Sequence, residues 1–142
     1  MIAYFDTSAL VKLYADEPGA QSARAAALEA ELMATSIITY AEMRSAFARK
    51  LRFADITAVA LKQFKEQFER GWESFQIVPI EEHTVRRAGE LAEAYGLKGF
   101  DAVHLASANI LATRFGATTF ACFDAELSRA ASACGMKLLS VE

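Results

Sequence analysis

Short apolar runs alternate along the chain with longer segments of helical periodicity. Apolar runs of about 4–8 residues bounded by turn residues are typical of buried strands. Five segments have this pattern: Ile2–Phe5, Leu32–Ile38, Phe75–Pro79, Thr118–Phe123 and Lys137–Val141. Because helical stretches separate these runs, we expect an α/β fold with a short, mostly parallel sheet of four or five strands and helices on both faces.

The helical stretches carry apolar residues at three- and four-residue spacing, which predicts one buried face on each helix. These stretches are Ser8–Tyr14, Ala20–Glu31, Thr39–Arg52, Thr57–Trp72, Glu82–Tyr95, Asp101–Phe115 and Ala125–Ala133. The stretch 101–115 is apolar almost all round, so we expect that helix to be buried. The aromatic stripe Phe64, Phe68 and Trp72 predicts a core face or, alternatively, a surface for a partner.

Length and composition predict a single globular domain over residues 1–142. The chain is 54% hydrophobic, which excludes intrinsic disorder. The two cysteines, Cys122 and Cys134, form no CxxC pair and are expected to be small buried thiols. The N-terminus lacks the basic region of a signal peptide, and no apolar run reaches the ~18 residues of a membrane span. We therefore expect no membrane association and a cytoplasmic location.

Four acidic residues lie beside predicted strand ends or helix starts: Asp6, Glu42, Asp101 and Asp124. The carboxyl ends of parallel strands share one edge of a sheet, where ligands of such sheets bind. Carboxylates gathered there repel one another unless a cation compensates, and oxygen ligands select Mg²⁺ or Mn²⁺. Such a site can activate water against a phosphodiester. Because the sequence contains no P-loop, GxGxxG or Ser-His-Asp arrangement, metal-assisted hydrolysis is the chemistry that it favours.

The same residues also fit a purely structural role. Aspartate is a favoured N-cap, and Asp6, Asp101 and Asp124 each precede or open a helical stretch. The spacing of Thr39 and Glu42 matches a capping box, in which the glutamate bonds back to the backbone. A non-catalytic binding module with capping acids therefore stays an alternative, as does a phosphatase that uses Asp6 as its nucleophile.

Four segments together carry a family resemblance. In chain order they read IAYFDTSALVKLY, SIITYAEM, LKGFDAVHLASA and FACFDAELSRAA. They resemble the PIN-domain ribonucleases, and most of all the toxins of VapBC-type toxin–antitoxin modules. The resemblance implies a PIN-like fold and a Mg²⁺- or Mn²⁺-dependent endoribonuclease that cuts RNA. It also implies a cognate antitoxin, whose helix fills a groove in the helical pair that bears the aromatic stripe, and a homodimer.

The resemblance also assigns roles to the acidic residues. It implies that Asp6 and Asp101 are the main metal ligands and that Glu42 and Asp124 hold water or a second ion. Ser8 is then a hydroxyl partner near the site. Many family members carry Ser or Thr shortly before the fourth aspartate. Cys122-Phe123 stands there in this sequence, so of the four acids Asp124 matches the family's pattern least well.

Two further features have both a functional and a structural interpretation. His104 lies one helical turn after Asp101, so it can assist the site or serve as a satisfied core histidine. The formal net charge is −3, yet setting the four site acids aside leaves 15 basic against 14 acidic residues. Several basic residues can follow RNA phosphates or simply cover solvated helix faces: Lys12, Arg44, Arg49, Lys50, Arg52, Lys62, Lys65, Arg70 and Lys98.

Overall fold

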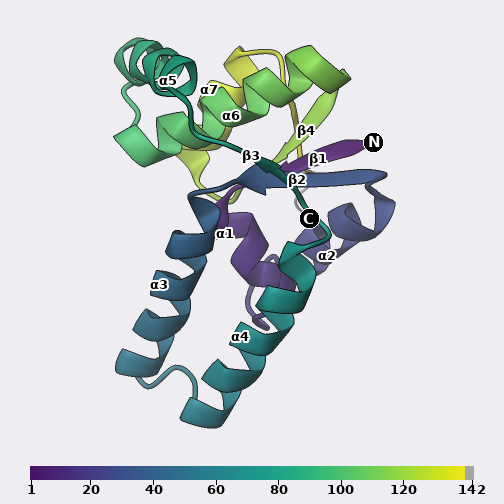
Figure 1. The fold of residues 1–142 in the computed structure, drawn as a ribbon, viewed down its shortest axis with the longest axis vertical. Helices are drawn as coiled ribbons and strands as arrows, with labels where there is room; N and C mark the ends of the chain where they lie inside the picture. Colours follow the sequence, from purple (N-terminus) through teal and green to yellow (C-terminus); the bar gives the residue numbers. More distant parts are fainter. Residues whose placement is uncertain (140–142) are drawn as a thin grey trace.

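A parallel β-sheet forms the centre of the molecule, which is a computed structural model that describes residues 1–139 (Figure 1). Its strands are β1 (Ile2–Phe5), β2 (Leu32–Ser36), β3 (Gln76–Val78), β4 (Thr118–Ala121) and β5 (Lys137–Leu138). Their order is β3-β2-β1-β4-β5, and each neighbouring pair is parallel. The predicted α/β class is therefore confirmed, with a sheet that is parallel across all five of these strands.

Helices cover both faces of the sheet, as predicted. One layer holds α1 (Thr7–Leu10), the 3₁₀ turn η1 (Val11–Leu13), α2 (Ala20–Glu29), α3 (Thr39–Arg52) and α4 (Ala58–Trp72). The opposite layer holds α5 (Glu82–Tyr95), α6 (Gly99–Phe115) and α7 (Ala125–Ala133). None of the helices within residues 1–139 is both long and apolar enough to cross a membrane.

The differences from the predicted elements lie at their ends. The stretch predicted as one helix over 8–14 starts at Thr7, where Asp6 caps it, and tightens into η1, as helix ends commonly do. The helix expected from Asp101 begins two residues earlier, at Gly99. The predicted strand 137–141 is β5 over its first two residues, and its last two residues lie outside the described part of the chain.

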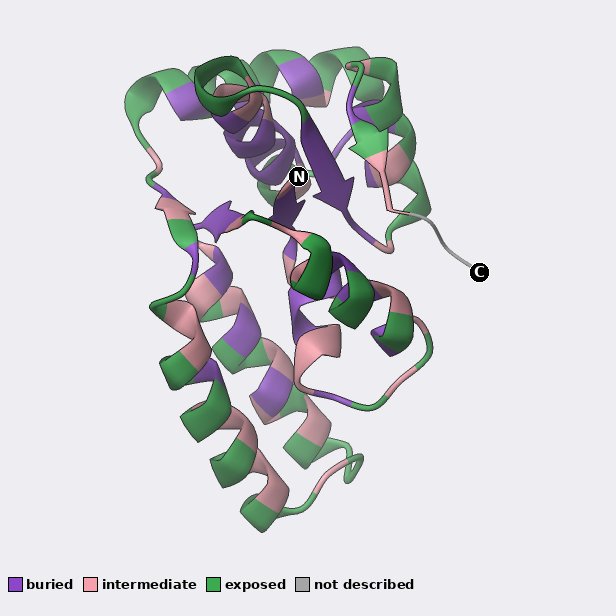
Figure 2. Ribbon diagram, turned by 90° about the vertical axis from the view of Figure 1, so that its right-hand side faces the viewer, coloured by how far each residue is buried: buried purple, intermediate pink, exposed green. Residues whose placement is uncertain are grey.

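Alternate residues of β1 point into two separate cores. Ala3 and Phe5 pack with the α1–α4 layer, whereas Tyr4 packs with the α5–α7 layer. Figure 2 shows the resulting burial along the sheet and the helices against it. Helix α6 is buried continuously from Ala102 to Ala108, which confirms the buried helix predicted from its all-round apolar sequence.

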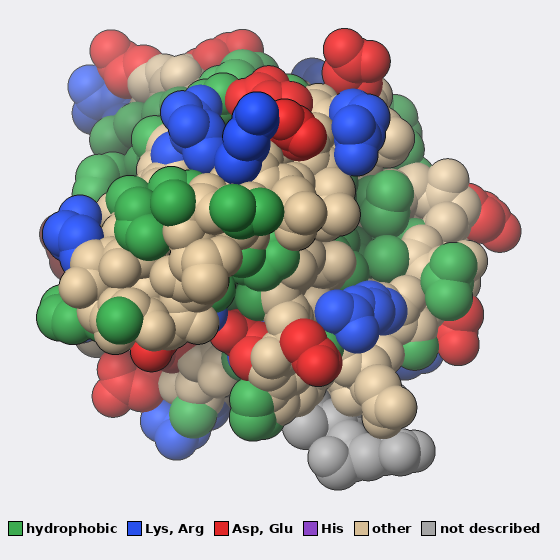
Figure 3. Space-filling model, turned by 90° about the horizontal axis from the view of Figure 1, so that it is seen from below, with side chains coloured by type: hydrophobic (Ala, Val, Ile, Leu, Met, Phe, Trp, Pro, Cys, Tyr) green, Lys and Arg blue, Asp and Glu red, His purple; other side chains and the backbone are tan. Residues whose placement is uncertain are grey.

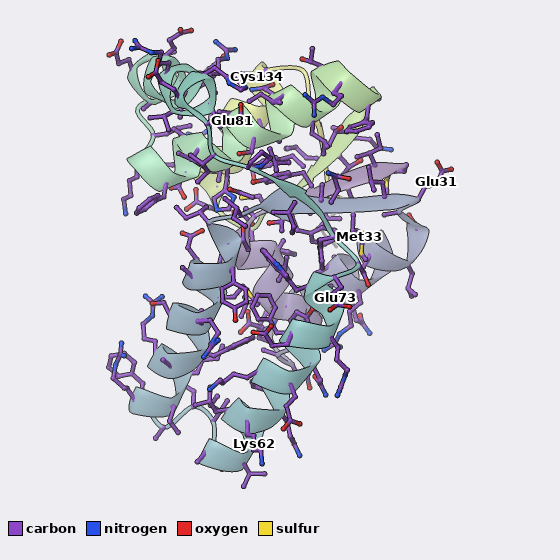
Figure 4. The ribbon with its side chains drawn as sticks, viewed as in Figure 1. Glu31, Met33, Lys62, Glu73, Glu81 and Cys134 are labelled. Atoms are coloured by element: carbon purple, nitrogen blue, oxygen red, sulfur yellow. The ribbon has the colours of Figure 1, made fainter. Side chains whose placement is uncertain are left out.

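The cysteines differ in their burial. Cys122 is buried, as predicted, whereas Cys134 is only half-buried because it caps the exposed end of α7. The Cys134 Sγ lies 3.7 Å from the hydroxyl of Tyr95 (Figure 4). The prediction of a small buried thiol therefore holds for Cys122 alone.

Helices α3 and α4 form a hairpin that extends away from the sheet, and aromatic rings hold the hairpin together (Figure 1). Phe68 of α4 is fully buried. Its ring centroid lies 5.4–6.0 Å from those of Tyr14, Tyr40, Phe47 and Trp72. Phe64 and Trp72 are half-buried. The predicted stripe thus supplies one core residue and two that are open at their edges.

Replacing Phe68 by alanine should lower the free energy of unfolding by about 3–5 kcal/mol, because a buried ring is lost and its neighbours cannot refill the space. Val59, on the same helix, is 68% exposed, so Val59→Ala is the matched control and should change stability by less than ~0.5 kcal/mol. Urea denaturation of the three proteins measures both effects. Equal stabilities for Phe68→Ala and Val59→Ala would contradict the packing described.

Candidate active site

The strand ends bring the four predicted acids to one edge of the sheet. Asp6 follows β1 directly, and its N–H donates to the carbonyl of Ala121 in β4 at 3.1 Å. Glu42 and Asp101 lie in the first turns of α3 and α6. Burial raises the pKa of Asp101, and the negative charges of Asp124, Asp6 and Glu42 raise it further, so Asp101 interacts with each of the other three carboxylates.

Asp6 combines a structural contact with a place in this cluster. Its side chain is 4% exposed. Its Oδ1 accepts hydrogen bonds from Ser8 Oγ at 2.7 Å and from the backbone N–H of Ala9 at 3.0 Å. Burial raises the pKa of the carboxyl, although His104 and these hydrogen bonds oppose the rise. Asp6 is therefore the N-cap of α1, as the capping alternative predicted, and it also faces the acidic cluster.

The capping box predicted for Glu42 is not formed. Helix α3 begins at Thr39 after Ile38, without a side-chain cap. The Glu42 Oε1 instead accepts from Thr7 Oγ1 at 2.6 Å and pairs with His104 Nε2 at 2.7 Å. Burial acts to raise the Glu42 pKa, but these two hydrogen bonds outweigh it and hold the pKa below its ordinary value. Two hydrogen bonds thus hold the Glu42 carboxylate within the cluster.

Asp101 is not an N-cap either. Helix α6 begins at Gly99, so Lys98 occupies the N-cap position and Asp101 lies within the first turn. The helix dipole favours a negative charge there, although burial and the neighbouring carboxylates disfavour it. Capping is therefore the wrong explanation for both Asp101 and Glu42.

Asp124 lies at the exposed rim of the cluster and caps α7 by accepting from the N–H of Leu127 at 2.8 Å. Cys122 and Phe123 hold the segment that precedes Asp124 in place. Cys122 Sγ accepts from the Asp124 N–H at 3.3 Å, and the Phe123 N–H donates to Ser8 Oγ at 2.9 Å. Ser8 therefore links β1 to this segment, in addition to its bond with Asp6.

His104 is the satisfied buried histidine that one interpretation predicted, but its partner belongs to the acidic cluster. The side chain is 2% exposed, and its Nδ1 lies 2.8 Å from the hydroxyl of Tyr4. Tyr4 and Thr7 were not among the site residues predicted from the sequence. Thr7 directly follows Asp6, which is a weak signal, whereas Tyr4 sits inside an apolar strand run without a polar pattern to mark it.

The donor set of this cluster suits a hard divalent cation. Within residues 1–139, no three His, Cys, Asp or Glu side chains lie close enough to hold a metal ion as they stand. Mg²⁺ usually takes only one or two carboxylates and keeps several waters. The raised pKa of Asp101 reflects burial and like-charge repulsion, and a bound cation would relieve the repulsion. Asp6 and Asp101 could therefore hold such an ion with water completing its shell.

Several of the basic residues are engaged within the chain. Glu17 pairs with the Nζ atoms of Lys50 at 2.8 Å and Lys12 at 3.0 Å. Arg44 lies 3.7 Å from Glu69 across the α3–α4 hairpin. These contacts favour a structural role for the three cations.

A groove of about 730 Å³ lies along the α3–α4 hairpin, away from the acidic cluster. Its lining combines apolar and charged side chains: Arg44, Ala58, Leu61, Lys62, Lys65, Glu66, Glu69 and Arg70. Lys62 lies near the outer end of α4 (Figure 4). Basic, acidic and hydrophobic side chains are interspersed on the underside of the molecule, the side toward which the hairpin extends (Figure 3). The groove is therefore lined by two apolar side chains and by charged ones, of which four are basic and two acidic.

Comparison with protein families gives one match over most of the chain. Residues 3–133 match the PIN domain. Two proteins of Mycobacterium tuberculosis are each 35% identical to this chain over 137 residues. They are Ribonuclease VapC45 of strain CDC 1551 / Oshkosh and Ribonuclease VapC49 of strain ATCC 25618 / H37Rv. That alignment covers 96% of this chain and 94% of each relative.

Solved structures share the fold. FitAcB from Neisseria gonorrhoeae has a TM-score of 0.72 at 21% identity, over 99% of this chain and 97% of that one. A toxin–antitoxin complex from Klebsiella pneumoniae has a TM-score of 0.63 at 22% identity, over 86% of both chains. VapBC2 from Rickettsia felis, bound to a promoter DNA fragment, has a TM-score of 0.66 at 17% identity over the full length of both.

Replacing Asp101 by asparagine should raise the free energy of unfolding in the absence of metal. The pKa of Asp101 is raised in the folded state, so ionising this side chain destabilises the fold. The wild type therefore loses stability as the pH rises from the ordinary aspartate pKa through the raised one. The difference from wild type should therefore vanish well below the ordinary aspartate pKa of 3.8 and be complete at neutral pH. Chemical denaturation in chelator across this pH range measures it.

Divalent metal should reverse the order of the two proteins. An ion at ~100 times its dissociation constant stabilises a folded protein by about 2.7 kcal/mol, and Asp101→Asn should lose most of that gain. Asp55→Asn, in the exposed α3–α4 connection, is the charge-matched control. A wild type that gains no stability from Mg²⁺ or Mn²⁺ would contradict the metal interpretation.

Proposed function

Because the chain belongs to the PIN-domain family, and within it to the VapC ribonucleases, we propose that it is a metal-dependent endoribonuclease and the toxin of a toxin–antitoxin module. The carrying observation is the placement of Asp6, Glu42, Asp101 and Asp124 at the carboxyl edge of the sheet, where the charges of the other three act on Asp101. We assign these four residues as the catalytic site of one PIN domain that spans residues 1–142.

Mg²⁺ or Mn²⁺ is the cofactor that the donor set supports. When bound, the ion would neutralise charge on the scissile phosphate and make a bound water more acidic. Asp6 and Asp101 would hold it, while Glu42 and Asp124 orient water or a second ion. Asp6 is preorganised for this role because Ser8 and the Ala9 N–H fix one of its oxygens.

The chain's own residues define how water is held for hydrolysis. Glu42 has a lowered pKa, so it is a charged acceptor for the protons of a water molecule at neutral pH. Asp101 is assigned to the ion, whose charge would relieve the like-charge repulsion that contributes to the raised pKa of this residue. We propose that Glu42 orients the water while Asp101 holds the ion.

Both alternatives are weaker. A non-catalytic module with capping acids fails to explain Glu42 and Asp101, because neither side chain caps a helix. A phosphatase with Asp6 as nucleophile is disfavoured by the PIN-domain match and by the two hydrogen bonds that already occupy Asp6 Oδ1.

We propose an antitoxin as the protein partner and the α3–α4 groove as its binding surface. A groove that has apolar side chains and a mainly basic charged lining suits an amphipathic segment with acidic flanks. The half-buried Phe64 and Trp72 lie on the same helix. A homodimer and action on RNA in the cytoplasm complete the proposal.

Purified wild-type protein should cleave RNA in Mg²⁺ or Mn²⁺ and stop in chelator. Asp6→Asn and Asp101→Asn should each lose more activity than the roughly 10–100-fold typical of residues around a metal site. Each substitution keeps the size of the side chain, and the amide oxygen of Asp6→Asn would still accept the capping hydrogen bond of α1. Gel analysis of a labelled RNA, with circular dichroism on the same samples, provides the measurement.

Asp55→Asn is again the control and should cleave like the wild type, because Asp55 lies in the α3–α4 connection. Wild-type rates for Asp6→Asn or Asp101→Asn in folded protein would remove those residues from the catalytic site. Undiminished cleavage in chelator would remove the metal from the mechanism.

Expression of the wild-type chain alone should arrest the growth of a bacterial host, because uncontrolled RNA cleavage stops translation. Asp101→Asn should relieve the arrest at equal protein level, since it removes a proposed metal ligand without removing the fold. Growth curves with quantified protein measure this. Normal growth despite abundant, RNA-cleaving wild-type protein would contradict the toxin role while leaving the nuclease assignment intact.

A further inference from the structure

A chain of hydrogen bonds runs from the central strand of the sheet to Glu42. The Tyr4 hydroxyl lies 2.8 Å from Nδ1 of His104, and Nε2 of His104 lies 2.7 Å from Oε1 of Glu42. Tyr4 is fully buried and His104 is 2% exposed. Thr7 Oγ1 adds a 2.6 Å bond to the same glutamate oxygen. Two segments far apart in sequence, residues 4–7 and the part of α6 that holds His104, therefore converge on one carboxylate atom of Glu42.

The direction of these bonds follows from the chemistry of the atoms. An ionised carboxylate oxygen only accepts, so the proton between Glu42 and His104 belongs to the ring Nε2. The Thr7 hydroxyl likewise donates to Glu42. Both of these hydrogen bonds end on Oε1, and among residues 1–139 no hydrogen bond engages Oε2.

The origin of this chain of bonds is rigid. Tyr4 sits in β1, which is paired on both sides by β2 and β4. Its ring stacks on Phe120 at 5.6 Å and meets the imidazole of His104 edge-on at 6.0 Å. Tyr4 is also two residues before Asp6, so the strand that places Asp6 also places the start of the chain that leads to Glu42.

We propose that His104 is a positioning residue that fixes the Glu42 carboxylate. Tyr4 fixes the imidazole of His104, and Thr7 donates a second hydrogen bond to Glu42 Oε1. This inference rests on the proposed function, because it assigns His104 a role in the same site. His104 itself does not touch the substrate or the ion. It holds one glutamate oxygen so that the other points in one direction, as partners around metal sites generally do.

Two substitutions of similar chemistry but different reach test the proposal. In His104→Gln the amide nitrogen can reach the former position of Nε2 and donate to Glu42, whereas in His104→Asn the shorter side chain cannot. The Asn variant should lower kcat for RNA cleavage by about 10–100-fold and weaken Mn²⁺ binding by calorimetry about 10-fold. Its KM for RNA should stay within about twofold, and Gln should restore most of both losses.

His83→Asn, on the exposed surface of α5, is the control for the substitution and should leave kcat and Mn²⁺ affinity unchanged. Tyr4→Phe, which keeps the stacked ring and removes only the hydroxyl, should lower kcat by a smaller factor than His104→Asn. Thermal unfolding of each variant establishes that the comparison is between folded proteins.

The outcomes separate this inference from the proposed function. A wild type that cleaves RNA, with His104→Asn equally fast, overturns positioning and leaves the nuclease intact. Equal losses of kcat and Mn²⁺ affinity in His104→Asn and His104→Gln also overturn it. Such losses would mean that His104 serves only the packing of the core, since they would not depend on whether the side chain reaches Glu42. If the wild type cleaves no RNA, the proposed function fails, and the Mn²⁺ affinities of the same pair still decide whether His104 positions Glu42. A wild type without activity or Mn²⁺ binding overturns both.

Discussion

The pairing of β1 between β2 and β4 is the constraint on which the rest of this structure depends. A central parallel strand is covered by neighbouring strands on both edges and by helices on both faces. Its carboxyl end is not covered in this way, so residues that follow the strand can line a site. Asp6 directly follows that end, and its backbone is tied to β4. The strand order then places the ends of β2 and β4 on either side, which brings Glu42 and Asp124 to the same edge.

The two faces of β1 give this strand a second role. Phe5 packs into the core beneath the α3–α4 hairpin, whereas Tyr4 packs into the core beneath α6. The acidic cluster lies where the two cores meet, since Glu42 comes from the first layer and His104 from the second. The hydrogen bond between them thus joins the two helical layers at the site itself.

Much of this arrangement could be predicted from the sequence, for a physical reason. Apolar runs and helical periodicity report burial directly, so the strands, helices and parallel sheet were predictable, as was the position of Asp6 at a strand end. Helix starts depend on one or two hydrogen bonds, which periodicity does not report. The capping roles considered for Glu42 and Asp101 were therefore wrong. Glu42 forms hydrogen bonds with Thr7 and His104 instead, and α6 begins two residues before Asp101. Tyr4 was unpredictable, since only the fold brings it to a histidine 100 residues away.

The four acids differ in whether they have a structural role in the fold. Asp6 and Asp124 cap helices, so a structural role accounts for their presence even without a ligand. Glu42 and Asp101 cap nothing, and their pKa values move in opposite directions. Two hydrogen-bond donors compensate the charge of Glu42. Burial and the neighbouring carboxylates raise the pKa of Asp101, although His104 partly opposes them. A fold selected only for stability would gain from removing the Asp101 charge. Its presence is therefore the feature that a purely structural explanation leaves unexplained, and a cation bound at this edge would supply the missing compensation.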